Sequence, residues 1–77
     1  MNKIKYILTR HAKERIKERD ISTVDVKKAL EHPDMTYPGK RGELNIIKQI
    51  KEDKKIRIVC KDEKTTKIII TAIVINE

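Results

Sequence analysis

The chain has 77 residues, the length of one domain, and we treat residues 1–77 as a single unit. It contains no Trp or Phe and one cysteine, Cys60, so we expect an aliphatic core and exclude an internal disulfide bond. The formal net charge of +7 favours an anionic partner such as nucleic acid or an acidic protein, and no apolar run is long enough to cross a membrane. With a single cysteine and no secretory signal pattern, we expect a cytoplasmic protein.

The first part of the chain predicts a short helix after an extended segment. Residues 3–8 fit either a short strand or an irregular lead-in. Thr9 is a suitable N-cap for a helix over residues 10–19. The apolar stripe of that helix is thin, because it consists of Ala12 and Ile16 only. We therefore expect the helix to pack through this stripe, with its charged residues at the edge.

A second helix follows directly. Ser22 and Asp25 have the spacing of a capping box, in which each side chain accepts a hydrogen bond from the other residue's backbone N–H. Pro33 ends the helix, because the residue before a proline avoids helical backbone angles. Three apolar residues form the predicted buried face: Val26, Ala29 and Leu30.

The second half of the chain predicts strands. Residues 35–37 form a short extended piece, and residues 38–42 form a positively charged loop. Three strands follow, over 44–51, 55–61 and 66–75. The sequence therefore predicts an α+β fold, with two short N-terminal helices packed on one face of a twisted, mainly antiparallel sheet of three to four strands.

The last predicted strand, residues 66–75, is apolar on both of its faces. Such a strand should be central in the sheet and covered on both sides. Two helices can cover only one face of the sheet. The second face therefore needs another layer, namely a dimer partner, a binding protein or residues 1–8, and we expect it to be an interaction site.

His11, Arg15 and Arg19 recur every four residues, so they share one face of the first predicted helix. A histidine can act as a general acid or base on a ribose hydroxyl, and an arginine can hold a phosphate with its two-pronged guanidinium. The alternatives are a local hydrogen bond for His11 and surface pairing with neighbouring acidic residues for the arginines. His11, His32 and Cys60 lack the spacing of a metal site, so we expect no metal and no cofactor.

Arg57 lies in the middle of a predicted strand, on the face opposite Ile56 and Ile58. A strand holds an arginine more rigidly than a loop does, and a preorganised phosphate site needs that rigidity. The alternative is an arginine on a half-exposed sheet face. Thr71 is a lone hydroxyl in an apolar strand and either bonds locally or points into a site. The remaining candidates for attracting RNA by charge are Arg10, Arg19, Lys40, Arg41, Lys48 and Lys61.

The first helix and its flanks also resemble a known family. The hallmark is a Thr-x-His-Ala-x-x-Arg-x-x-x-Arg stretch, matched here by Thr9, His11, Ala12, Arg15 and Arg19. It is similar to a small prokaryotic domain grouped with the RelE-like ribonuclease toxins of toxin–antitoxin systems, which share a fold with barnase, EndoU and colicin-type nucleases. The likeness spans roughly residues 6–75.

This resemblance implies cleavage of RNA without a metal, through attack of the ribose 2′-hydroxyl. It implies free RNA or ribosome-bound mRNA as substrate and an antitoxin protein as partner. His11 and Arg15 match the signature, Arg57 falls where such toxins often place a sheet arginine, and Thr71 lies on the closing strand. Some relatives have a catalytic tyrosine or histidine after the last strand; this sequence has neither there, so His11 is the expected proton-transfer residue.

The leading prediction is thus a metal-independent endoribonuclease toxin, with His11, Arg15 and Arg57 as catalytic residues. The alternative is a non-catalytic basic module of the same fold that binds RNA or protein and does not depend on His11. The scarcity of aromatic residues argues against recognition of single strands by base stacking. A helix-turn-helix DNA-binding protein fits the helix pair, but Asp25 and Glu31 make the second helix a poor recognition helix.

Overall fold

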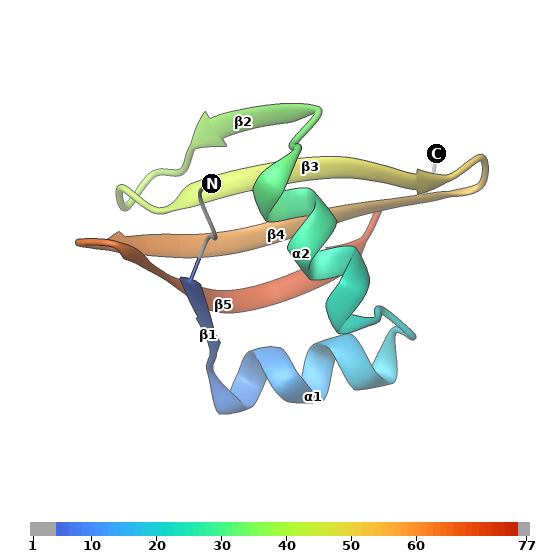
Figure 1. Ribbon diagram of the computed structural model, residues 1–77, viewed down its shortest axis with the longest axis horizontal. Helices are drawn as coiled ribbons and strands as arrows, with labels where there is room; N and C mark the ends of the chain where they lie inside the picture. Colours follow the sequence, from blue (N-terminus) through green and yellow to red (C-terminus); the bar gives the residue numbers. More distant parts are fainter. Residues whose placement is uncertain (1–4, 76–77) are drawn as a thin grey trace.

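The computed structural model describes residues 5–75 and contains two helices and one five-stranded sheet (Figure 1). The helices are α1 (Arg10–Glu18) and α2 (Thr23–Glu31). The strands are β1 (Lys5–Leu8), β2 (Met35–Pro38), β3 (Leu44–Lys51), β4 (Lys54–Glu63) and β5 (Thr66–Val74). Their order across the sheet is β1-β5-β4-β3-β2. β1 runs parallel to β5, and the other three pairings are antiparallel.

The α+β class is confirmed, but the predicted sheet of three to four mainly antiparallel strands is wrong: the sheet is mixed and has five strands. Two four-residue strands, β1 and β2, form its edges. β4 takes the central position that we predicted for residues 66–75, and β5 lies between β1 and β4. β1 pairs with β5, which follows about sixty residues later in the chain; Thr9, directly after β1, and Ile69, in β5, are 60 residues apart. No local pattern in the sequence reveals such a pairing.

One irregularity interrupts the pairing of β4 with β5. Cys60 lies opposite Ile69, whereas Val59 lies opposite Thr71, so Ile70 is one extra residue in β5. Such a β-bulge shifts the alternation of the side chains along the strand. Ile69 and Ala72, three residues apart, are consequently both buried in the core.

The N-termini of both helices form as the sequence predicts. The Thr9 hydroxyl accepts a hydrogen bond from the Ala12 backbone N–H at 3.1 Å and donates one to the Ile69 carbonyl at 3.0 Å. Thr9 therefore caps α1 and also ties it to β5. The capping box of Ser22 and Asp25 is present at the start of α2.

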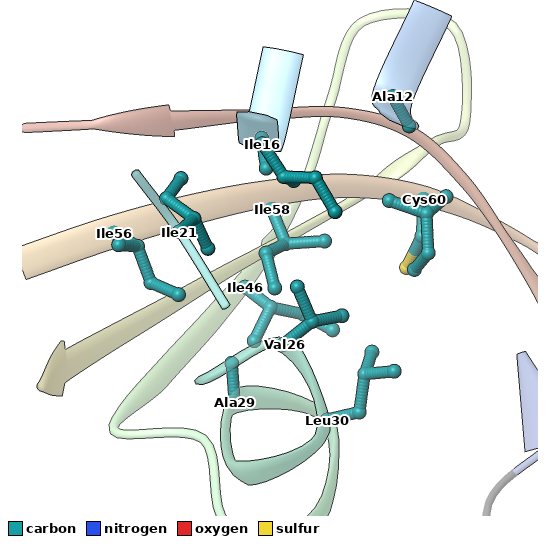
Figure 2. Packing of buried hydrophobic residues seen from close by; sticks show 12 residues of the cluster. Ala12, Ile16, Ile21, Val26, Ala29, Leu30, Ile46, Ile56, Ile58 and Cys60 are labelled. Atoms are coloured by element: carbon teal, nitrogen blue, oxygen red, sulfur yellow. The ribbon is translucent and has the colours of Figure 1, made fainter. Parts of the chain in front are cut away.

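The core lies between the helices and one face of the sheet. α1 contributes Ala12 and Ile16, and β4 contributes Ile56, Ile58 and Cys60. Figure 2 shows these side chains meeting those of α2 and β3 in one layer. Burial raises the pKa of the Cys60 thiol, which is consistent with a structural cysteine. No helix within the described residues is long and apolar enough to span a membrane.

Replacing Thr9 with valine should destabilise the fold by about 0.5–2 kcal/mol, the usual cost of losing an N-cap side chain. Valine has the shape of threonine but cannot make the bonds to Ala12 and Ile69. The free energy of unfolding in urea measures the loss. Thr9→Ser is the matched control, because serine keeps the hydroxyl; equal losses in both variants would contradict a hydrogen-bonding role.

Asp34, just before β2, should make stability depend on pH. Its carboxylate accepts a hydrogen bond from the Gln49 backbone N–H at 2.7 Å, and chiefly for this reason its pKa lies below the ordinary value of 3.8. A lowered native pKa stabilises the fold above the unfolded-state pKa, and that stabilisation is lost as the pH falls through the native value. Asp34→Asn should therefore be less stable than the wild type at pH 7, and the difference should shrink below about pH 4. Urea midpoints at the two pH values test this; a constant difference would contradict it.

Candidate functional site

The face of the sheet that points away from the helices forms a second surface, which we call the open face. No helix or strand formed by residues 5–75 covers it (Figure 1). We predicted that residues 1–8 were one candidate for its missing layer; residues 5–8 instead extend the sheet as β1, and residues 1–4 lie outside the described part. By strand register, its central side chains are Met35, Tyr37, Asn45, Ile47, Gln49, Lys55, Arg57, Val59, Lys61, Thr71 and Ile73.

Across the middle of the open face, one row of side chains places Arg57 between two apolar residues. In this row Arg57 on β4 has Ile47 of β3 on one side and Ile73 of β5 on the other. The next row along the strands is more polar and consists of Tyr37, Asn45, Val59 and Thr71. Residues on adjacent rows are diagonal neighbours about 7–8 Å apart, within reach of long side chains.

Arg57 has hydrogen-bonding capacity that the protein does not fill. Its Nη1 donates to the Tyr37 hydroxyl at 3.5 Å, a long bond. Its Nε is buried and has no hydrogen-bond partner. Leaving a buried donor of a charged group unpaired costs free energy, so a ligand that supplies an acceptor to this atom would be bound favourably. An anion with several acceptor oxygens, such as a phosphate, suits a guanidinium in this state.

The charges around Arg57 have the same sign. Among the described strand residues, the open face carries the cations Lys55, Arg57 and Lys61, and Lys5 on the edge strand β1. Its carboxylate, Glu63, lies at the far end of β4, opposite Thr66. The potential over the centre of this face is therefore positive, and it attracts anions.

The structure does not bring the three predicted catalytic residues together. On α1, the Arg15 Nε donates to the His11 Nε2 at 3.3 Å, and the Arg15 Nη1 pairs with Glu18 at 2.7 Å. Within residues 5–75, no hydrogen bond or ion pair joins His11 or Arg15 to Arg57. α1 packs on the core side of the sheet, whereas Arg57 is on the open face.

The predicted RNA-binding residues also separate into groups. Lys61 and Thr71 lie on the open face with Arg57. Lys48 lies on the helix side, opposite Ile56, and pairs with Asp34 at 3.4 Å. The other four are exposed, on and beside α1 or in the loop between β2 and β3: Arg10, Arg19, Lys40 and Arg41.

Sequence reasoning missed Tyr37 and Asn45 as site residues. Asn45 is only 8% exposed, which is unusual for a polar side chain, and it lies directly opposite Tyr37. An asparagine inside an otherwise apolar segment of the sequence could have indicated Asn45 as a site residue. Tyr37 gave no signal of its own, because its position beside Arg57 depends on the pairing of β2 with β3.

Comparison with known proteins places the chain in a family. Residues 8–74 match the family described as Domain of unknown function (DUF4258). The chain belongs to this family. No curated protein and no solved structure matches this DUF4258 protein. The description of the family names no activity, so the likeness to RelE-like ribonucleases stays a prediction. Across residues 5–75, no group of three or more His, Cys, Asp or Glu side chains could hold a metal ion.

Proposed function

We propose that this DUF4258 protein is a metal-independent endoribonuclease that binds RNA on the open face of its sheet. The observation that carries the proposal is Arg57, a guanidinium on the central strand with an unpaired buried Nε at the centre of a positive face. Preorganised positive charge at the point where negative charge develops is commonly the largest contribution to catalysis. We also propose, as expected from the sequence, that the protein acts as a toxin and that it is located in the cytoplasm.

The proposed reaction is a transesterification within the RNA. The ribose 2′-oxygen bonds to phosphorus and the bond from phosphorus to the 5′-oxygen breaks, which yields a 2′,3′-cyclic phosphate and a 5′-hydroxyl. Water accepts the proton of the 2′-hydroxyl and supplies a proton to the leaving 5′-oxygen. Arg57 stabilises the extra negative charge on the phosphoryl oxygens as the new bond forms.

A second candidate is a module of the same fold that binds RNA without cleaving it. A specific observation favours it: among the described residues, the side chain hydrogen-bonded to Arg57 is the Tyr37 hydroxyl, and no histidine or carboxylate contacts that guanidinium. General acid–base groups typically contribute about 10²–10⁴-fold to a rate. Cleavage that relies on Arg57 alone should therefore be slow.

The test is RNA cleavage by purified protein in EDTA, with Arg57→Ala beside the wild type. Lys48→Ala is a matched control, because it removes a cation from the helix side of the sheet. We expect the wild type and Lys48→Ala to cleave and Arg57→Ala to be inactive while still folded. Binding of RNA without cleavage by any variant supports the second candidate. Absence of both binding and cleavage, on free and ribosome-bound RNA, contradicts both functions.

His11→Ala should change the cleavage rate by less than about threefold, well below the loss that a true acid–base residue gives. His11 bonds to Arg15 on α1, and Arg57 lies on the other side of the sheet. Initial rates in EDTA measure the effect. A loss of about a hundredfold or more would place His11 in the catalytic site, as the sequence resemblance implies, and would contradict a site confined to the open face.

The partner expected from the resemblance, an antitoxin protein, fits the same face. An acidic, partly apolar segment would complement Lys55, Arg57 and Lys61 together with exposed Met35. A homodimer through the open face is disfavoured, because it would bring two positive faces together. We therefore propose that the antitoxin and RNA compete for this face.

A further inference from the structure

We infer that the ring of Tyr37 is a stacking platform for one unpaired nucleobase beside the phosphate that Arg57 binds, so that the substrate is single-stranded RNA. This inference rests on the proposed function and adds the class of substrate to it. The platform is the exposed ring itself, and the register of β2 with β3 fixes its place on the open face.

The position of Tyr37 next to Arg57 is the first support. Tyr37 belongs to the edge strand β2, yet its hydroxyl reaches the Arg57 Nη1 at 3.5 Å. The ring therefore extends from the edge of the sheet towards its centre. A ligand anchored on the guanidinium has this ring as its nearest aromatic surface.

The surroundings of the ring are the second support. Tyr37 is 38% exposed, whereas Asn45, directly opposite it, is 8% exposed. Tyr37 therefore stays accessible to a ligand beside a neighbour that is closed to solvent. A large hydrophobic side chain that stays exposed beside a cation is suited to a base, because every base has an aromatic face.

Composition argued against base stacking, since the chain has only two aromatic residues, Tyr6 and Tyr37. Stacking of one base needs one ring in the right place. Tyr37 meets that condition because folding brings it to the guanidinium. A base in a duplex is already stacked on its neighbours and cannot lie on the ring, so the platform selects single strands and loops.

The experiment measures binding of RNA that cannot be cleaved. The probe is a short oligonucleotide with 2′-O-methyl riboses, used as a single strand, as the same sequence in a duplex, and as a single strand without bases in its centre. The proteins are the wild type, Tyr37→Phe, Tyr37→Leu and Arg57→Ala. Phenylalanine keeps the ring and loses the hydroxyl, whereas leucine keeps an apolar side chain without a ring.

We expect the wild type to bind the single strand more tightly than the duplex. Tyr37→Phe should bind within about threefold of the wild type, and Tyr37→Leu should bind the intact single strand about 5- to 150-fold more weakly. The loss in Tyr37→Leu should disappear on the strand without central bases. Equal binding by Tyr37→Leu and the wild type, or an equal loss on the baseless strand, would overturn the inference.

The outcomes separate the inference from the proposed function. If Arg57→Ala weakens binding and Tyr37→Leu does not, RNA binds on the open face without stacking on Tyr37. If no oligonucleotide binds, or if an acidic protein binds and RNA does not, the proposed function fails as well. Tyrosine fluorescence gives a second readout: in Tyr6→Phe, Tyr37 is the remaining tyrosine of a chain without Trp, and stacking should quench its emission.

Discussion

Replacing Arg57 with lysine should lower RNA cleavage by about 10²–10³-fold, the loss that follows removal of one preorganised donor from a charged transition state. The substitution keeps the positive charge and removes the planar fork of N–H donors, which matches phosphate geometry and which an ammonium lacks. Arg57 is fixed on the central strand between Ile47 and Ile73, so little rearrangement can compensate. Initial rates on single-stranded RNA in EDTA measure the effect.

Lys61→Ala is the control for this prediction. Lys61 is on the same strand and the same face, but it lies opposite Ile68, near the end of the sheet. We expect this variant to keep the cleavage rate at saturating RNA, and to bind RNA with a weaker dependence on salt, because one phosphate contact is lost. If Arg57→Lys cleaves at the wild-type rate, positive charge alone is sufficient and the fork geometry is not part of the mechanism.

Replacing Ile58 with alanine should destabilise the fold by about 2–5 kcal/mol, because the cavity left in a packed core cannot close. Ile58 is fully buried on the central strand, between Ile46 of β3 and Ala72 of β5. A domain of this length has a total stability of about 4–12 kcal/mol, so the change removes a large part of it. Urea unfolding measures the loss, and thermal unfolding should show a much lower midpoint.

Ile7→Ala is the matched control, since Ile7 has the same side chain but is 58% exposed on β1. Its loss should stay within about 0.5 kcal/mol. A loss similar to that of Ile58→Ala would mean that something covers this edge of the open face in solution. Repeating the measurement at several protein concentrations would then identify a second copy of the chain as the cover.

Local patterns in the sequence predict the local structure well. The caps at Thr9 and Ser22 mark the starts of both helices, and each forms its expected hydrogen bond. Such patterns allow a strand within residues 3–8 and predict an extended piece over residues 35–37, but they do not show how either edge strand pairs. β1 depends on a pairing with β5 across most of the chain, and β2 depends on a loop that returns Tyr37 to β3. These pairings are set by tertiary packing, which the order of polar and apolar residues does not encode.

The candidate site shows the same division. Arg57 was predicted as a site residue because the alternation of side chains along a strand shows which residues point away from the core. His11 and Arg15 do share a helix face, and they bond to each other as the spacing predicts. Helical spacing alone does not show which face of the sheet the helix covers. Combined with the alternation along the strand it does, because the helices cover the apolar face of Ile56 and Ile58 and Arg57 lies on the other face.

The residues that carry the family resemblance include two with structural roles. The Thr9 hydroxyl bonds to the helix and to the sheet, and Ala12 is fully buried where α1 packs. A side chain larger than a methyl group at this position would push α1 away from β5. Part of the signature therefore describes how the helix packs on the sheet, independently of any chemistry.

The extra residue in β5 marks a place where the length of this chain can vary. Removal of Ile70 would leave Ile69 opposite Cys60 and Thr71 opposite Val59, so strict alternation would return with both residues on their present faces. Ile69 would still face the core, and Thr9 could keep its attachment to the Ile69 carbonyl. Relatives can therefore lack the residue at position 70 without a change of register, and other insertions and deletions should gather in the turn between β2 and β3.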